Sequence, residues 1–236
     1  MNEAISETDG DGDLLSLESY PNKTDRVYEI LLDNITKRNF APGSKLGEQY
    51  LADELGVSKT PVREALSRLE RENLVNIYPN RGAYVVEITR EDIIEIYDLR
   101  EVLEGLAARQ SARKIDRRGL DRMRKLISSM ENSLEKGDLE EYSGHDSEFH
   151  GMLGHISGNS RLQKMVQNLR YQARILMASS VQIPGRAENS LQDHKDIFES
   201  LEAGNGPEAE RKVRKHTKDT KEVVLENYDE IGSNAG

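Results

Sequence analysis

The sequence predicts a mainly α-helical protein with two parts, an N-terminal winged helix-turn-helix and a C-terminal antiparallel helical bundle. Three observations predict this fold class. Apolar residues recur at helical spacing over most of the 236 residues, two short strand-like segments flank residues 79–82, and no convincing strand follows residue 86. A chain of this length exceeds what one ordinary bundle needs, so a small domain and a larger one are expected.

Composition excludes several classes of protein. The chain contains no cysteine, which excludes disulfides, thiolate zinc fingers and cysteine nucleophiles. No apolar run approaches the ~20 residues that span a bilayer, and the first residues lack the basic and apolar order of a signal peptide. We therefore expect a cytoplasmic protein with no membrane partner.

Residues 1–21 are expected to form a disordered acidic tail. They carry six acidic side chains, no basic ones and only scattered leucine, which is too polar a composition to bury a core. No site is assigned to this segment.

The first folded domain is expected over residues 22–88. A helix is predicted over residues 24–38, followed by a stop at Pro42-Gly43. A second helix ends at Gly56, where glycine adopts the left-handed conformation at low cost, and Ser58 can cap a third helix. Residues 74–78 and 83–86 then flank a tight turn. Three helices followed by a hairpin form a winged helix-turn-helix.

An all-helical domain is expected over residues 89–232. Thr89 and Asp92 have the spacing of a capping box, and they open the first of about six helical stretches that fill the rest of the chain. The connection over residues 87–90 is short, so movement of the bundle is expected to reach the first domain. The stretches are separated by Asp116, Gly137-Asp138, Gly158-Asn159, Pro184-Gly185 and residues 204–207.

The third helix has the composition of a recognition helix, whose first turns enter the major groove of DNA. Arg63 is expected to contact guanine, because its planar guanidinium matches guanine O6 and N7. Ser58 and Thr60 at the helix start are expected to meet phosphate, and Lys59 a guanine or a phosphate. Arg81 at the wing tip is expected to reach the DNA backbone or the minor groove. The alternative is that these charges only solvate a helical hairpin, but the turn, helix and wing motifs agree. The expected DNA-binding residues are Gln49, Ser58, Lys59, Thr60, Arg63, Arg68 and Arg81.

The net charge of −10 does not exclude binding to double-stranded DNA. Six of the excess acidic groups belong to residues 1–21, whereas residues 22–90 carry eleven basic and ten acidic side chains. DNA binding requires a local basic surface rather than a basic chain.

These motifs resemble the GntR family of bacterial and archaeal regulators. The resemblance is carried by Leu51 to Val57, Ser58 to Leu66, Leu69, Glu72 to Val75 and Pro79 to Ala83. It implies a sequence-specific DNA-binding regulator of transcription. Two positions depart from the family pattern: Lys59 stands where arginine is frequent, and Gln49 where some members have arginine. No particular operator sequence is therefore transferred to this chain.

One carboxylate and three histidines in the second domain have the spacing of a metal site. Asp146 and His150 lie four residues apart and share one helix face, and His194 and His216 lie on two later helices. Such a set suits Zn²⁺, Ni²⁺, Mn²⁺ or Fe²⁺ and leaves coordination positions for water or a ligand carboxylate. A single histidine more often forms ordinary hydrogen bonds, and His145 and His155 are assigned to that role.

The helical domain resembles the FCD ligand-binding domain of the FadR subfamily. That domain has an Asp-x-x-x-His pair and two later histidines, which Asp146, His150, His194 and His216 match in order. The resemblance implies a divalent metal, with zinc as the first choice, and an arginine facing the cavity at Arg100. Arg100 is thus expected to bind an effector carboxylate, with a surface salt bridge to Glu104 or Glu101 as the alternative. Asn168 and Arg174 are further candidates for the cavity.

The expected function is that of a homodimeric repressor. Two recognition helices would bind a pseudo-palindromic operator, and a small organic acid between metal and Arg100 would change the spacing of the heads. A metal-dependent hydrolase is an alternative, but no positioned general base, Gly-x-Ser-x-Gly motif or phosphate loop is evident, so an enzyme is not expected. A dimer that binds DNA without sensing a ligand is the third possibility.

Overall fold

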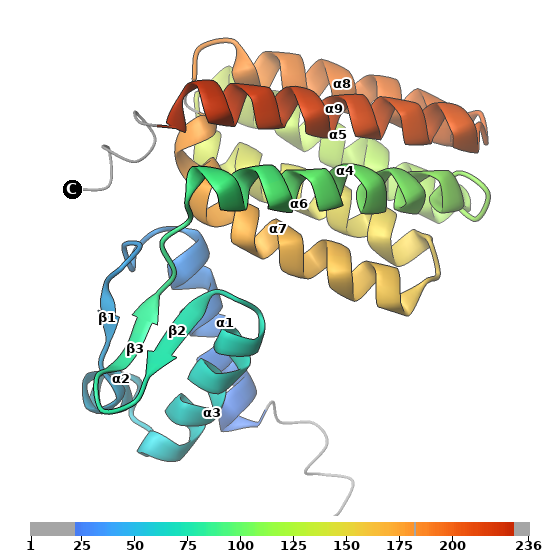
Figure 1. Cartoon of the computed structure of the whole chain (residues 1–236). Coiled ribbons are helices and arrows are strands. Elements are labelled where there is room, and N and C mark those ends of the chain that lie inside the picture. Colours follow the sequence, from blue (N-terminus) through green and yellow to red (C-terminus); the bar gives the residue numbers. More distant parts are fainter. Residues whose placement is uncertain (1–21, 182, 229–236) are drawn as a thin grey trace, which may run out of the picture.

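The computed structural model describes residues 22–181 and 183–228 and confirms the predicted fold class (Figure 1). The tail predicted over residues 1–21 lies outside the described residues. In the first domain the elements are α1 (Lys23–Thr36), β1 (Lys45–Leu46), α2 (Glu48–Leu55), α3 (Lys59–Arg71), β2 (Val75–Tyr78) and β3 (Gly82–Val85). In the second domain they are α4 (Arg90–Ser111), α5 (Arg117–Lys136), α6 (Leu139–Ile156), α7 (Ser160–Ser180), α8 (Arg186–Glu202) and α9 (Gly206–Glu226).

The first domain follows the predicted local signals, with one addition. Gly56 ends α2 with φ of 63°, and Ser58 occupies the N-cap position of α3 without a capping hydrogen bond from its side chain. The wing is a three-stranded antiparallel sheet in the order β1-β3-β2, with Val75 opposite Val85. The two-residue strand β1 was not predicted, because a segment so short shows no alternation.

A hydrophobic core joins the three helices of the first domain to its sheet. Apolar side chains from α1 and α3 are fully buried against one another, which fixes the orientation of α3 relative to the wing. The central ones are Leu31, Ile35, Val62, Leu66 and Leu69.

The second domain contains the six expected helices within the described residues. The predicted capping box at Thr89 starts α4, and Asp116, Asp138 and Asn205 cap later helices through their side chains. Helix α4 packs closely along α9, since a Cβ at Gly105 would lie only 2.6 Å from the Arg214 side chain. The bundle core is separate from that of the first domain.

Helix α7 is the bundle helix nearest the first domain in Figure 1, and it packs against α1. Ile175 of α7 is buried within the apolar core of the first domain, and Tyr171 packs beside it. No helix in the described part of the chain is both long and apolar enough to cross a membrane.

Candidate metal centre

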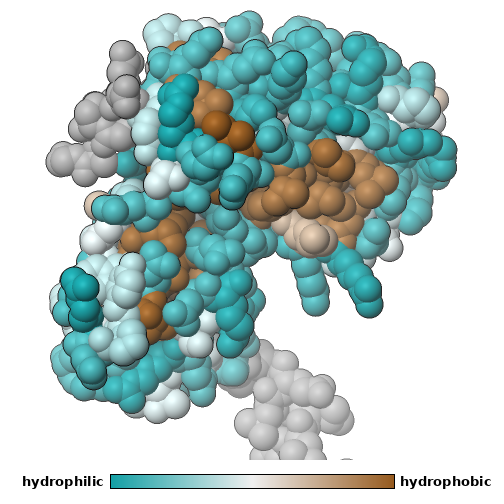
Figure 2. All heavy atoms as spheres, in the orientation of Figure 1, coloured by the Kyte–Doolittle hydropathy of each residue, from teal (hydrophilic) through white to brown (hydrophobic). Residues whose placement is uncertain are grey.

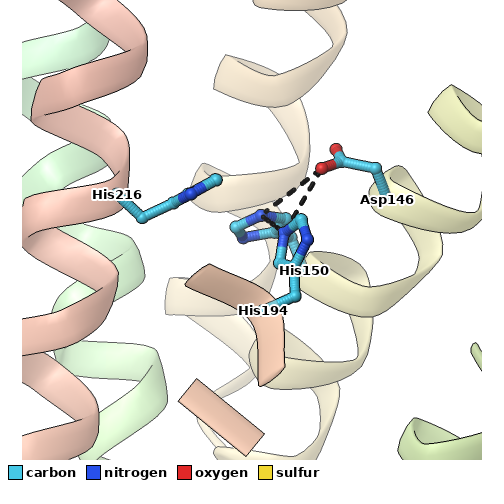
Figure 3. A group of neighbouring side chains, drawn as sticks. All are labelled: Asp146, His150, His194 and His216. Atoms are coloured by element: carbon cyan, nitrogen blue, oxygen red, sulfur yellow. Dashed lines mark hydrogen bonds and ion pairs between the residues drawn. The ribbon is translucent and has the colours of Figure 1, made fainter. Parts of the chain in front are cut away.

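Asp146, His150, His194 and His216 converge inside the bundle from three helices (Figure 3). One ligand atom from each residue lies within 4.8 Å of all the others, and all four side chains are buried. The Nε2 atoms of His150 and His194 are 3.0 Å apart, and Asp146 Oδ1 lies 3.3 Å from His194 Nε2. Helix α6 places Asp146 and His150 one turn apart on one face, as their spacing predicted.

Two of the three imidazoles contact a carboxylate outside the cluster through their Nδ1 atoms. His150 Nδ1 lies 3.0 Å from Glu104 Oε2, and His216 Nδ1 lies 3.0 Å from Asp193 Oδ2. Metal-binding histidines usually have such a partner, because it fixes the ring and the tautomer. Nε2 of His150 and of His216 is therefore the nitrogen left to face the cluster.

Four further charged and polar groups form the wall around the cluster. Arg100 and Glu104 are about 98 % buried and joined by a 2.8 Å contact, and Arg170 lies 3.4 Å from Glu104 and 3.0 Å from Asp146. The Arg100 guanidinium also stacks over the Tyr97 ring. The two guanidinium groups of the wall are therefore balanced by Glu104 and by Asp146 of the cluster.

The pKa shifts favour metal-binding protonation states. Burial first, and then the nearby Arg170, lowers the pKa of His150 to about 4, and burial also lowers the pKa of His194, well below its ordinary value. Both imidazoles are thus neutral at pH 7. Burial opposes ionisation of Asp146, but His150, His194 and Arg170 together lower the pKa of Asp146 below its ordinary value.

The donor set fits a divalent transition metal. Ligands at about 2.0–2.2 Å from one ion lie roughly 3–4 Å from one another, and the observed separations among Asp146, His150 and His194 are 3.0, 3.3 and 3.9 Å. A donor set of three imidazoles and a carboxylate suits zinc and its neighbours. A bound ion would polarise any ligand oxygen placed on it.

The effector candidates lie in different places. Arg100 faces the buried wall beside the cluster, and its Nη1 has no hydrogen-bond partner among the described residues. It pairs with Glu104, yet in the interior rather than on the surface. Arg174 is half-buried, and burial first and then Arg170 lowers its pKa. Asn168 is turned elsewhere, because its amide donates to the Glu72 carbonyl of the first domain.

Sequence reasoning missed Glu104, Arg170 and Asp193 as members of the site. A signal for Arg170 was present, because it lies in line with the buried Leu162 and Val166 and thus places a charge on the apolar face of α7. Glu104 was considered only as a surface partner of Arg100. His145 and His155, which were assigned no metal role, are absent from the cluster; His155 is exposed.

The DNA-facing candidates gather at the start of α3 and on the wing. Lys59, Thr60 and Arg63 are exposed on neighbouring positions of α3, and Arg81 is exposed at the hairpin tip. Arg63 donates to Glu48 of α2 over 2.6 Å, a contact on the surface that leaves its side chain 64 % exposed. Gln49 is also exposed on α2, where it donates to Asp53.

Arg68 lies on a different face of α3 from Arg63. It lies five residues after Arg63, which turns it by about 140° around the helix axis. Its guanidinium stacks 3.6 Å from the centre of the Tyr28 ring and contacts Asp25 and Glu72. Arg68 therefore fastens α3 to α1 and is not on the face that presents Arg63.

Models of two known domain families match this chain. A sequence model described as bacterial regulatory proteins, gntR family, matches residues 23–85, and an FCD domain model matches residues 95–219. The transcriptional repressor RspR of Escherichia coli K12 is 27% identical over 84% of this chain and 87% of its own length. The Uxu operon regulator of Haemophilus influenzae is 27% identical over 91% of this chain and 86% of its own length.

Solved structures show the same fold. McbR/YncC of E. coli superposes with a TM-score of 0.80 at 22% identity, covering 89% of this chain and all of the other. A GntR regulator from Rhodococcus sp. RHA1 gives 0.74 at 27% identity, covering 87% and 99%. The chain therefore belongs to the GntR family of transcription regulators, in the group that joins the DNA-binding head to an FCD domain, and is a ligand-responsive DNA-binding regulator.

Proposed function

We propose that this regulator is a repressor whose affinity for a pseudo-palindromic operator is set by a small organic acid at a metal centre formed by Asp146, His150, His194 and His216. The observation that carries this proposal is the convergence of four buried donor atoms within 4.8 Å. We take zinc as the first ion to test, followed by Ni²⁺, Mn²⁺ and Fe²⁺.

The buried wall supports an anionic effector. Arg100 Nη1, Arg170 Nε and the Tyr97 hydroxyl are buried without hydrogen-bond partners among the described residues. Buried donors of this kind are costly unless a ligand or water satisfies them. A carboxylate with one oxygen on the metal and one on Arg100 would satisfy a guanidinium N–H that the protein leaves open. Arg174 remains a candidate for a more distant group of the effector.

We propose that the site senses its ligand and does not turn it over. Hydrolysis would need a free general base beside the metal, and Glu104 is the carboxylate closest in position to such a role. Burial opposes its charge, but Arg100, Arg170 and His150 hold the pKa of Glu104 well below its usual range. A carboxylate so strongly stabilised as an anion is a weak base.

We propose a homodimer that associates through the exposed apolar face of the bundle. Leu99, Val102 and Leu106 line one side of α4 and are 54 %, 53 % and 36 % exposed, and Met165 of α7 is 56 % exposed. Figure 2 shows a continuous apolar patch in the region of α4 and α7. A second copy would cover this patch isologously and give the two-fold symmetry that a palindrome requires. Because its partner is operator DNA, we place the protein in the cytoplasm.

The first test is a thermal-melt screen of the full chain, metal-stripped and reloaded with each ion, against small organic acids. Ligands that bind only the folded state raise the melting temperature by mass action. The proposal expects a rise with metal and a further rise with particular acids only when metal is present. Absence of both shifts would contradict the sensing site and favour a dimer that binds DNA independently of ligand.

A further inference from the structure

Helix α7 contacts the metal cluster and the DNA-binding head within two turns. Arg170, which is 97 % buried, donates from Nη2 to Asp146 Oδ2 over 3.0 Å and places Nη1 3.4 Å from Glu104. Asn168 and Gln172 lie two residues before and two residues after Arg170. Their side chains point toward the first domain, whereas that of Arg170 points toward the cluster. Their amides donate to one oxygen, the backbone carbonyl of Glu72, over 3.0 and 3.1 Å.

Glu72 is the C-cap residue of the recognition helix α3. Its carbonyl lies where a helix leaves backbone acceptors unpaired, so both amides satisfy an acceptor at the end of α3. The Asn168 and Gln172 side chains also bond to each other over 2.8 Å, which holds them as one unit. Tyr28 of α1 donates to the Glu72 carboxylate over 2.6 Å and fixes the same residue from the head side.

Apolar packing keeps this contact in register. Ile175 lies one turn beyond Gln172 and is 99 % buried in the core of the head. Since packed helices shift as units, a displacement of α7 at Arg170 moves Asn168 and Gln172 against Glu72. In this position of α7 both amides lie within hydrogen-bond distance of the carbonyl.

The charges explain why Arg170 would respond to the cluster. Without a cation, the carboxylates of Asp146 and Glu104 balance the guanidinium groups of Arg100 and Arg170. A cation on Asp146 takes up part of the negative charge that holds Arg170 and adds positive charge beside it. Occupancy of the cluster therefore weakens the Asp146–Arg170 contact.

We propose that the Asn168–Gln172 pair is the positioning contact through which the occupancy of the Asp146/His150/His194/His216 cluster sets the orientation of the recognition helix. This inference rests on the proposed function in that the cluster must bind a cation. It assigns to Asn168 a role in coupling the domains instead of in the effector cavity.

The test compares the full-length wild type with the Asn168→Ala/Gln172→Ala double variant and with Gln163→Ala. Asn168 is half-buried and Gln172 is buried, but neither belongs to an apolar core, so the double variant removes the amides without removing an apolar core side chain. Gln163 is an exposed amide on the same helix and serves as the matched control. The probes are Zn²⁺ alone and a duplex enriched by the wild type from a random-sequence pool.

Two affinities are measured for each protein: duplex affinity with and without Zn²⁺, and Zn²⁺ affinity with and without the duplex. Coupling is reciprocal, so both ratios must agree, and typical couplings are about 5- to 150-fold. We expect wild type and Gln163→Ala to show such a ratio. The double variant should keep the Zn²⁺ affinity of the free protein while its ratio falls toward one.

Two results would contradict the inference without contradicting the metal centre. In the first, the double variant has the same ratio of affinities as the wild type. In the second, the wild type binds Zn²⁺ without any change in its affinity for the duplex. Failure of the wild type to bind Zn²⁺ would instead contradict the proposed function itself. Hydrogen exchange at the amides around Glu72 gives an independent readout without DNA. Zn²⁺ should change it in the wild type and not in the double variant.

Discussion

At the scale of single residues, burial decides what each titratable group does. His150 and His155 lie five residues apart on α6, yet the first is 1 % exposed beside Glu104 and the second lies on the surface. Removal from water disfavours the charged imidazole, so His150 stays neutral where a surface histidine would take up a proton. The same chemical group is thus prepared for metal at one position only.

This shift predicts that the metal-free protein loses stability in mild acid. The pKa of His150 is about 4 in the folded chain, whereas a free imidazole titrates near about 6.5. Between these values the unfolded chain binds more protons, so the free energy of unfolding decreases as the pH falls. We expect His150 to contribute a loss of about 2 kcal/mol between pH 7 and pH 5, and His194 to act in the same direction.

The measurement is denaturant unfolding in chelator at both pH values. His150→Gln should flatten the pH dependence, and the exposed His155→Gln should leave it unchanged. If the free energy of unfolding changed equally with pH in the wild type, His150→Gln and His155→Gln, the lowered pKa of His150 would be contradicted.

Arg63 offers a second prediction for a single side chain. It is exposed at the start of α3, where a bidentate contact with guanine is worth about 1–3 kcal/mol of discrimination. Arg63→Ala should therefore remove most of the preference for operator over random duplex. Competition binding at fixed salt checks it. Arg71→Ala is the control, because Arg71 is exposed at the opposite end of the same helix. Unchanged preference in Arg63→Ala would mean that another element reads the bases.

At the scale of elements, the long helices α4 and α7 each serve two surfaces. One face of α4 carries the buried pair Arg100 and Glu104, and the opposite side carries the exposed Leu99 and Val102. Adjacent positions on a helix differ by about 100°, so Leu99 and Arg100 separate onto different sides. A single element thereby connects the sensing interior to the proposed dimer surface.

The dimer proposal predicts that charge on this face separates the copies. Leu99→Glu/Val102→Glu should yield a folded monomer, because both side chains are more than half exposed and contribute little to the core. Affinity for a two-site operator should fall strongly, while a single half-site should bind as before. Sedimentation velocity reports the mass, and Lys125→Glu on α5, also a charge change at an exposed position, is the control. A double variant that remains dimeric would place the interface elsewhere.

At the scale of the whole molecule, the metal centre joins three helices, two of which, α6 and α8, are separated along the chain by the whole of α7. Asp146 and His150 come from α6, His194 from α8 and His216 from α9. An ion held by all three would bind the folded state alone and so add to its stability.

Zinc at about 100 times its dissociation constant should stabilise the fold by about 2.7 kcal/mol. For a chain of this size that corresponds to a rise of about 5–10 °C in melting temperature. His194→Ala should lose this rise and the response to effector, while its metal-free affinity for operator stays near that of the wild type. His155→Ala should keep the rise in melting temperature with zinc and the response to effector. Loss of folding in His194→Ala without any metal effect in the wild type would make the cluster a structural network of hydrogen bonds.

The sequence by itself determined the parts of this protein that depend on local signals. The glycine after α2, the capping residues of the bundle helices and the four-residue step from Asp146 to His150 are fixed by backbone preference and helical period. The later histidines were placed by resemblance to the FCD domain. Local sequence signals and resemblance to a known domain are both available from the sequence alone.

Only the tertiary structure decided which side chains meet across elements. It paired the two-residue β1 with β3, turned Arg68 toward Tyr28, and brought Arg170 between Asp146 and Glu104. It also directed Asn168 toward Glu72 in place of the effector cavity. Helical period fixes the face on which a residue lies, but the neighbour of that face depends on how helices distant in sequence pack, and that is set by the whole core at once.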